Sequence, residues 1–159
     1  MTMRVQAVEP NIDTGPLLAG AQFADAFRVE LASTQLDART AAQQMLGRWP
    51  RWAEILLALR NRLVAPFGLK TPDPTGPGTS GTIGVFPVLS ETPNRLVLGF
   101  DDGHLDFRVV VDVAACGTGQ SVTATTLVLT HNLFGRAYLA VILPFHRLIA
   151  RTMLRQVAA

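Results

Sequence analysis

The segment from about Leu133 to Gln156 places the strongest constraint on the fold, because its side chains separate into two helical faces. At about 100° per residue, four arginines fall within an arc of about 100°: Arg136, Arg147, Arg151 and Arg155. The opposite side carries a broad apolar face made of Tyr138, Val141, Ile142, Phe145, Ile149 and Thr152. A long helix with such a face needs a large apolar surface to pack against. Pro144 lies within the segment and predicts a kink, since proline removes one backbone hydrogen bond.

That surface is predicted by four strand-like runs in the second half of the chain, at Thr82–Leu89, Arg95–Phe100, His104–Val113 and Ser121–Thr130. Short turn sequences join these runs. One of them contains Asp102-Gly103, which suits a two-residue hairpin because both central positions of a type I′ turn need a positive φ. Strands joined by short turns form an antiparallel meander. We therefore expect an antiparallel sheet that curls around the long helix.

The first half of the chain supplies one more strand and two shorter helices. Residues Ala21–Leu31 alternate apolar and polar side chains, as a half-buried strand does. Thr34-Gln-Leu-Asp37 offers capping side chains for a helix expected over Thr40–Leu46 with Gly47 as its stop. A second helix is expected from Pro50 to Pro66. The second helix carries a predicted core stripe of Trp52, Ile55, Leu56, Leu59 and Leu63.

Proline and glycine interrupt residues 1–20 and residues 70–81. We therefore predict an irregular N-terminal lead-in and a surface loop at these places. The order strand, two helices, meander and long helix is that of an α+β protein with a single domain over residues 21–159.

Composition narrows the class of protein. Apolar residues make up 48% of the 159 residues and charged residues 16%, which excludes a disordered chain. Cys116 is the only cysteine, so a disulfide scaffold, a zinc ribbon and an iron–sulfur site are excluded. The net charge of +2 is too small to indicate nucleic-acid binding. The start has no apolar signal core, and the most apolar helical run, Ala137–Phe145, is short. We expect a cytoplasmic protein without a transmembrane segment.

Several stretches of the chain have counterparts in a known superfamily: Ala24–Arg28, Leu57–Asn61, Phe67–Lys70, Gly99–Arg108, His131–Tyr138 and Pro144–Arg147. Together with the order of elements, they resemble the helix-grip fold of the SRPBCC (START-like) superfamily, and within it one uncharacterised bacterial family. The resemblance implies an internal cavity that binds a small, largely apolar molecule. It also implies a curved antiparallel sheet of about five to seven strands wrapped around the long helix.

Three places in the sequence carry polar side chains that bear on such a cavity. Asp25 is a carboxylate on the apolar face of the first strand, which indicates either a frayed strand end or bulge, or a polar anchor in a pocket. His104, Asp106 and Arg108 share one face of their strand, either a solvated outer face or a polar patch in the cavity. His131 precedes the long helix and is either structural or directed at a ligand, whereas its neighbour Asn132 is a candidate helix N-cap.

The predicted cavity lining combines these polar candidates with apolar side chains from the strands and the long helix. The expected ligand-binding residues are Asp25, Phe27, Phe86, Phe100, Phe107, Val109, Leu127, His131, Tyr138, Ile142 and Phe145. We expect no metal and no cofactor, because His104, His131 and His146 lack metal-ligand spacing and no glycine-rich loop opens a helix.

Three functions remain open at the level of sequence. The first is a binding module for a lipid-like, polyketide-like or aromatic ligand. The second is a cavity enzyme of the cyclase, hydratase or isomerase type, whose acid–base group would be Asp25, Asp106 or His131. The third is a membrane-surface docking module that uses the arginines of the long helix on anionic lipid. A homodimer is also compatible with the sequence.

Overall fold

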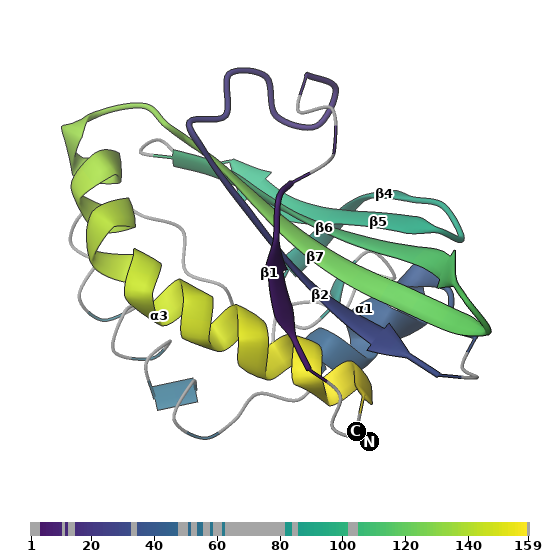
Figure 1. The fold of residues 1–159 in the computed structure, drawn as a ribbon. Coiled ribbons are helices and arrows are strands. Elements are labelled where there is room, and N and C mark those ends of the chain that lie inside the picture. Colours follow the sequence, from purple (N-terminus) through teal and green to yellow (C-terminus); the bar gives the residue numbers. More distant parts are fainter. Residues whose placement is uncertain are drawn as a thin grey trace.

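The computed structural model describes residues 4–10, 12, 15–32, 35–47, 51, 54–55, 58, 62, 82–83, 86–101 and 105–158. Seven strands form one antiparallel sheet in the order β1-β2-β7-β6-β5-β4-β3. The long helix α3 (Leu133–Ala158) crosses one face of this sheet, and the short helix α1 (Ala38–Leu46) lies on the same side, against the C-terminal part of α3 (Figure 1). The arrangement is the predicted α+β fold, in which a curved antiparallel sheet grips a long C-terminal helix.

The strands that make up the sheet are β1 (Gln6–Val8), β2 (Phe23–Leu31), β3 (Thr82–Ile83), β4 (Phe86–Glu91), β5 (Arg95–Asp101), β6 (Leu105–Cys116) and β7 (Gly119–Thr130). The predicted antiparallel meander is confirmed in β4 to β7, and the end of the meander pairs with β2. The longest hairpin, β6–β7, turns at Gly117, whose φ of 58° is readily adopted by glycine. The strand predicted over residues 82–89 divides into β3 and β4.

Strand β1 corrects the prediction that residues 1–20 are irregular. Its three residues pair with β2, with Gln6 opposite Arg28. A free strand edge exposes unpaired backbone N–H and C=O groups, and a short added strand satisfies them. The sequence of β1 is too short to show a periodic pattern, so only the neighbouring edge makes it a strand.

Helix α1 begins at its predicted cap. The side chain of Asp37 accepts a hydrogen bond from the backbone N–H of Thr40 at 2.7 Å, and the helix runs to Gly47. It therefore starts two residues before the predicted Thr40, because the capping aspartate and the buried Ala38 precede that position. Its buried face is made of Ala38, Ala41, Ala42, Met45 and Leu46.

The second predicted helix falls largely outside the described residues. Its described members are all helical: Arg51, Glu54, Ile55, Ala58 and Arg62. Ile55 is 61% exposed, which corrects its predicted place in a core stripe. The other four members of that stripe and the predicted loop at residues 70–81 lie outside the described side chains.

Helix α3 starts at the N-cap predicted from sequence, because the side chain of Asn132 accepts a hydrogen bond from the backbone N–H of Gly135 at 2.9 Å. Its C-terminal part is anchored by Met153, Leu154 and Val157, which are at most 5% exposed. Residues Leu133–Val157 are also long and apolar enough, with a mean hydropathy of 1.3, to cross a membrane by length and composition alone. Pro144, at which a kink is predicted, lies inside the helix. The helix axis changes direction along its N-terminal half (Figure 1).

The strand register decides which side chains face the two helices. Across the sheet, Phe27 of β2 lies opposite Ala124 of β7, which lies opposite Val111 of β6, and all three belong to the core around α1 and α3. Because side chains alternate along a strand, Phe107 and Val109 face the helices as well. Asp106 and Arg108 then face the other way, so they do not line the space between the sheet and the long helix.

Candidate functional site

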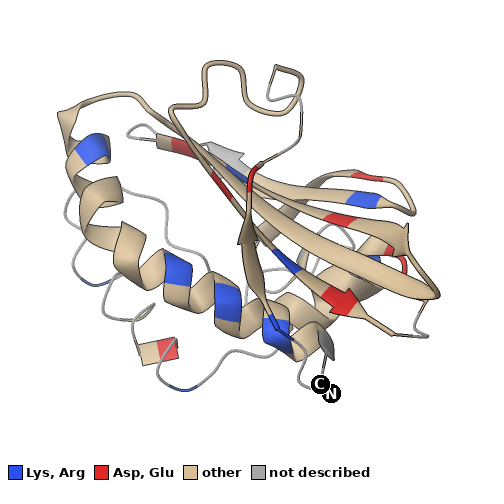
Figure 2. Ribbon diagram, in the orientation of Figure 1, with Lys and Arg blue, Asp and Glu red and all other residues tan. Residues whose placement is uncertain are grey.

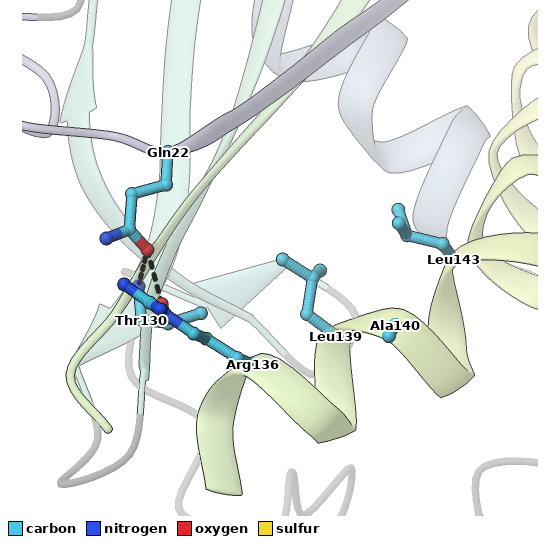
Figure 3. Close-up of a pocket in the computed structure, with 6 residues that line it drawn as sticks. All are labelled: Gln22, Thr130, Arg136, Leu139, Ala140 and Leu143. Atoms are coloured by element: carbon cyan, nitrogen blue, oxygen red, sulfur yellow. Dashed lines mark hydrogen bonds between the residues drawn. The ribbon is translucent and has the colours of Figure 1, made fainter. Parts of the chain in front are cut away.

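A groove lies between the first turns of α3 and the sheet. Its volume is about 380 Å³, and its lining residues are Gln22, Thr130, Arg136, Leu139, Ala140 and Leu143. One end of the groove is polar, because the side-chain oxygen of Gln22 accepts hydrogen bonds from the backbone N–H of Thr130 at 3.2 Å and from the Thr130 hydroxyl. The side chain of Arg136 extends toward this end, whereas Leu139 and Leu143 form the apolar wall (Figure 3).

A carboxylate–imidazole pair joins the sheet to α3 one turn beyond Leu143. The Nε2 atom of His146 lies 3.2 Å from each carboxylate oxygen of Asp25. The two side chains are only 23% and 18% exposed. The edge of the Phe23 ring contacts the imidazole at a centroid distance of 6.1 Å. A polar group in such apolar surroundings is stable only when it has a hydrogen-bonding partner, and here each side chain is the partner of the other.

The sheet surface around this pair is apolar and only half-buried. Asp25 of β2 pairs with Thr126 of β7, which pairs with Val109 of β6. The next row toward the groove contains Phe23, Val128 and Phe107 on the same three strands. Val128 is buried, whereas the other side chains of the two rows named here are only partly covered. The Phe107 ring in turn contacts the Phe86 ring edge-on, with centroids 5.4 Å apart.

The adjacent part of the helix-facing side of the sheet is buried. The row formed by Phe27, Ala124, Val111 and Leu96 is at most 6% exposed, because α1 and the C-terminal part of α3 cover it. The helix-facing surface therefore has a closed half, which is core, and a half that is accessible beside the N-terminal part of α3. The accessible half holds the Asp25–His146 pair.

Several predicted ligand-binding residues are brought together in the accessible half. Asp25, Phe86, Phe107 and Val109 contribute from the sheet, on the side that faces the helices. From α3, Tyr138 and Ile142 are half-buried. Phe100 lies opposite Phe107 in the register, but its side chain is outside the described residues.

Four other predicted lining residues lie elsewhere. Phe27 is 3% exposed and belongs to the closed core, with the guanidinium of Arg151 stacked 5.3 Å from its ring centroid. Leu127 occupies an odd position of the β7 register, so it faces away from the helices, contrary to the prediction. His131 lies just beyond β7, and its Nε2 is 3.0 Å from Asp106, which also faces away from the helices. Phe145 is 46% exposed on α3, because the phase of the helix is set by the buried residues at its C-terminal end.

The polar row on the far side of the sheet forms side-chain pairs with neighbouring residues. His131 lies 3.0 Å from Asp106, and Arg95 lies 2.6 Å from Asp112. His104, the remaining predicted member of this row, is outside the described residues. Asp106 and Asp112 are 16% and 23% exposed, so both pairs are partly buried. In the part of the chain that the structure describes, no cluster of three metal-ligating side chains occurs.

His146 is the site residue that the sequence reasoning missed. The predicted apolar arc placed it near the edge of the buried face. In the structure it lies in the middle of that face, in line with Ile142, Leu139, Ala150 and Val157, all of which are at least half-buried. The signal was present, because residues 139, 143, 146, 150, 154 and 157 repeat at intervals of three and four. The groove residues Gln22, Thr130 and Arg136 carry no comparable sequence signal.

A protein-family model matches residues 17–153 of the chain, a range that includes both Asp25 and His146. The family is described as a protein of unknown function, DUF2867. No curated protein matches the chain at a significant level.

Proposed function

The chain belongs to the DUF2867 family, and from this premise we propose that it is a binding protein for a small, largely apolar molecule that carries a hydrogen-bonding group. The ligand lies between the N-terminal half of α3 and the sheet. Its apolar part rests on Phe107, Val109 and Ile142, and its polar group meets the Asp25–His146 pair.

The observation that carries this proposal is the position of that pair. Small-molecule sites are mostly apolar surfaces with a few fixed polar groups that orient the ligand. Asp25 and His146 are such groups, because they lie 3.2 Å apart within a half-buried apolar surface. A separate groove of about 380 Å³ reaches Leu143, which is one helical turn before His146. Since Nε2 of the imidazole is engaged by the carboxylate, Nδ1 is the ring atom that remains to donate to or accept from a ligand.

The family resemblance extends the proposal. The strand order and the long C-terminal helix fit a helix grip, which supports membership of the SRPBCC superfamily. Thirteen of the 14 basic residues are arginine, which is typical of a GC-rich bacterial genome. We include a bacterial origin and a cytoplasmic location in the proposal, with the single cysteine as support for the latter.

Two measurements test the binding function. Native mass spectrometry of freshly purified protein is expected to show a co-purified small molecule. A panel of fatty acids, polyketides and aromatic acids is expected to contain compounds that raise the melting temperature, since a ligand at 100 times its Kd stabilises the folded state by about 2.7 kcal/mol. Absence of both a bound molecule and any thermal gain would refute the proposal.

Two site variants and one control variant make the binding test specific to the site. His146→Gln is expected to weaken binding of any ligand found by about tenfold, because it removes Nδ1, the imidazole atom available to hydrogen-bond the ligand. Ala140→Trp fills the groove and is expected to reduce binding further. The matched control is His131→Gln, which breaks the other histidine–aspartate pair on the opposite face and should leave affinity unchanged.

A second function is favoured by the same geometry. A histidine held by a carboxylate is the arrangement of a general base, so the pair suits a cyclase, hydratase or isomerase. If the protein is such an enzyme, the co-purified or added ligand changes in mass or isomer composition with time. His146→Gln then abolishes the conversion while Asp25→Asn lowers it. A ligand recovered unchanged after long incubation assigns the site to binding alone.

A further inference from the structure

The outer face of α3 exposes large apolar side chains. Leu133, Val141, Leu148 and Phe145 are 81%, 71%, 54% and 46% exposed. The last three lie on one side of the helix, because positions 141, 145 and 148 are spaced by four and three residues. Scattered exposed leucines are common on protein surfaces, but several on one face of one helix mark an interaction surface. We call Val141, Phe145 and Leu148 the outer stripe.

The charge of the same helix is entirely positive. Residues 133–158 contain four arginines and no aspartate or glutamate. Figure 2 shows these arginines along α3, whereas the acidic residues drawn lie on other elements. All four arginine residues are exposed. Arg136 lines the groove and Arg151 stacks on Phe27. Among the described residues, Arg147 and Arg155 have no ion-pair partner.

We propose that the outer stripe and its arginines dock the protein on a membrane surface that contains anionic lipid. The helix lies in the plane of the membrane, with Val141, Phe145 and Leu148 inserted between the headgroups. Arg147 and Arg155, which are exposed and not engaged with the groove or with Phe27, bind the lipid phosphates with their forked guanidinium groups. An apolar face next to arginines is the pattern of a helix that binds at this interface.

The anchoring of α3 explains why the helix lies on the membrane rather than across it. Its length and hydropathy would permit a span, yet Met153, Leu154 and Val157 hold its C-terminal part in the core with α1. Crossing a membrane would remove these contacts. Docking by the outer stripe leaves these core contacts intact. The groove lies on the sheet side of the helix, so the membrane does not cover it. The proposal rests on exposure and charge alone, so it is independent of the ligand-binding function.

Vesicle flotation of the full chain tests the proposal. The protein is expected to float with phosphatidylcholine vesicles that contain phosphatidylglycerol and to remain in solution with pure phosphatidylcholine. Removal of one charge by Arg147→Gln or Arg155→Gln should reduce partitioning about fivefold, which equals about 1 kcal/mol at 1.4 kcal/mol per tenfold. Raised salt should also reduce partitioning into the vesicles, because it screens exposed charges.

The apolar contribution is tested by the double variant Val141→Gln/Leu148→Gln, which should reduce flotation roughly tenfold without changing the melting temperature. The matched controls lie away from the stripe. Leu89→Gln removes an apolar side chain that is 47% exposed on β4, and Arg28→Gln removes an arginine from the face of the sheet turned away from α3. Both controls should float like the parent protein.

Two results would overturn the inference. One is flotation that does not depend on phosphatidylglycerol or on these residues. The other is a stable dimer in solution that Val141→Gln/Leu148→Gln converts to a monomer while no vesicle binding occurs, which would identify a second copy as the occupant of the stripe.

Discussion

At the scale of single residues, the pair of Asp25 and His146 is the feature that most distinguishes this molecule from a plain α+β core. The two residues are 121 positions apart in the chain and 3.2 Å apart in the structure. An apolar pair of similar volume would pack here without any polar atoms to satisfy. A polar pair retained at such a place indicates a role in recognition or chemistry, since functional sites often reduce stability.

This reasoning predicts opposite effects for single and double substitution. His146→Leu leaves the Asp25 carboxylate half-buried without its partner, and we expect a loss of roughly 1–3 kcal/mol in the free energy of unfolding. Asp25→Leu/His146→Leu removes both polar groups and is expected to recover that loss or exceed the parent, while ligand binding stays absent. Urea denaturation of the three proteins measures the free energies. A double variant less stable than the single one would show that the pair is structural.

Two carboxylates, Asp37 at the N-cap of α1 and Glu91 at the end of β4, predict how the fold responds to acid. Hydrogen bonds from Arg39 at 2.6 and 2.7 Å lower the pKa of Glu91, and hydrogen bonds from Thr40 lower the pKa of Asp37. A carboxylate whose folded pKa lies below its unfolded value stabilises the fold above that unfolded value. The contribution is lost as the pH falls through the folded pKa.

The expected result concerns the pH range below about 4.5, the ordinary pKa of a glutamate. The melting temperature of the parent protein should fall more steeply in this range than that of Glu91→Gln. Arg39→Gln should flatten the curve in the same way, since it removes the cause of the shift. Thermal melting at a series of pH values checks this, and parallel curves for all three proteins would contradict it.

At the scale of elements, α3 combines two functions along its length. Its C-terminal part belongs to the core, and its N-terminal half forms one wall of the groove. The outer stripe lies on the outer side of its middle turns. The sequence predicts the extent and the cap of this helix well, because periodicity and the side chain of Asn132 are local signals. The sequence predicts less well which side of the helix is buried, since Val141 and Phe145 are apolar yet exposed. Aliphatic side chains on two sides of a helix leave its rotation undetermined until the sheet is in place.

Two leucines of α3 test this division. Leu154 is fully buried, whereas Leu148 is 54% exposed. Leu154→Ala should lower the free energy of unfolding by about 2–5 kcal/mol, because it leaves a cavity in the core. Leu148→Ala should change it by at most about 0.5 kcal/mol. Denaturant titration distinguishes them, and equal losses would place both leucines in the core.

At the scale of the whole molecule, the sheet is built around the β6–β7 hairpin. Each of these strands has twelve residues, and they lie at the centre of the sheet. The edge strands β1 and β3 have three and two residues. Short edges with few partners open more easily than long central strands.

Hydrogen exchange should therefore show a gradient across the sheet. Amides of Val110, Val111 and Val122 are expected to exchange at rates near that of global unfolding, whereas amides of β1 exchange fastest among the paired strands. Exchange measured by NMR or mass spectrometry tests the order. Protection of β1 equal to that of β7 would mean that the N-terminal strand is part of the cooperative core.

The sequence by itself determined the order of elements, the antiparallel meander, the caps of both helices and the α+β class, because each depends on neighbours a few residues apart. It also placed Asp25 on the apolar face. Only the tertiary structure decided that His146 is the partner of Asp25, that His131 and Leu127 face away from the helices, and that β1 exists. These depend on strand register and helix rotation, and a shift of one residue in either reverses which side chains face inward.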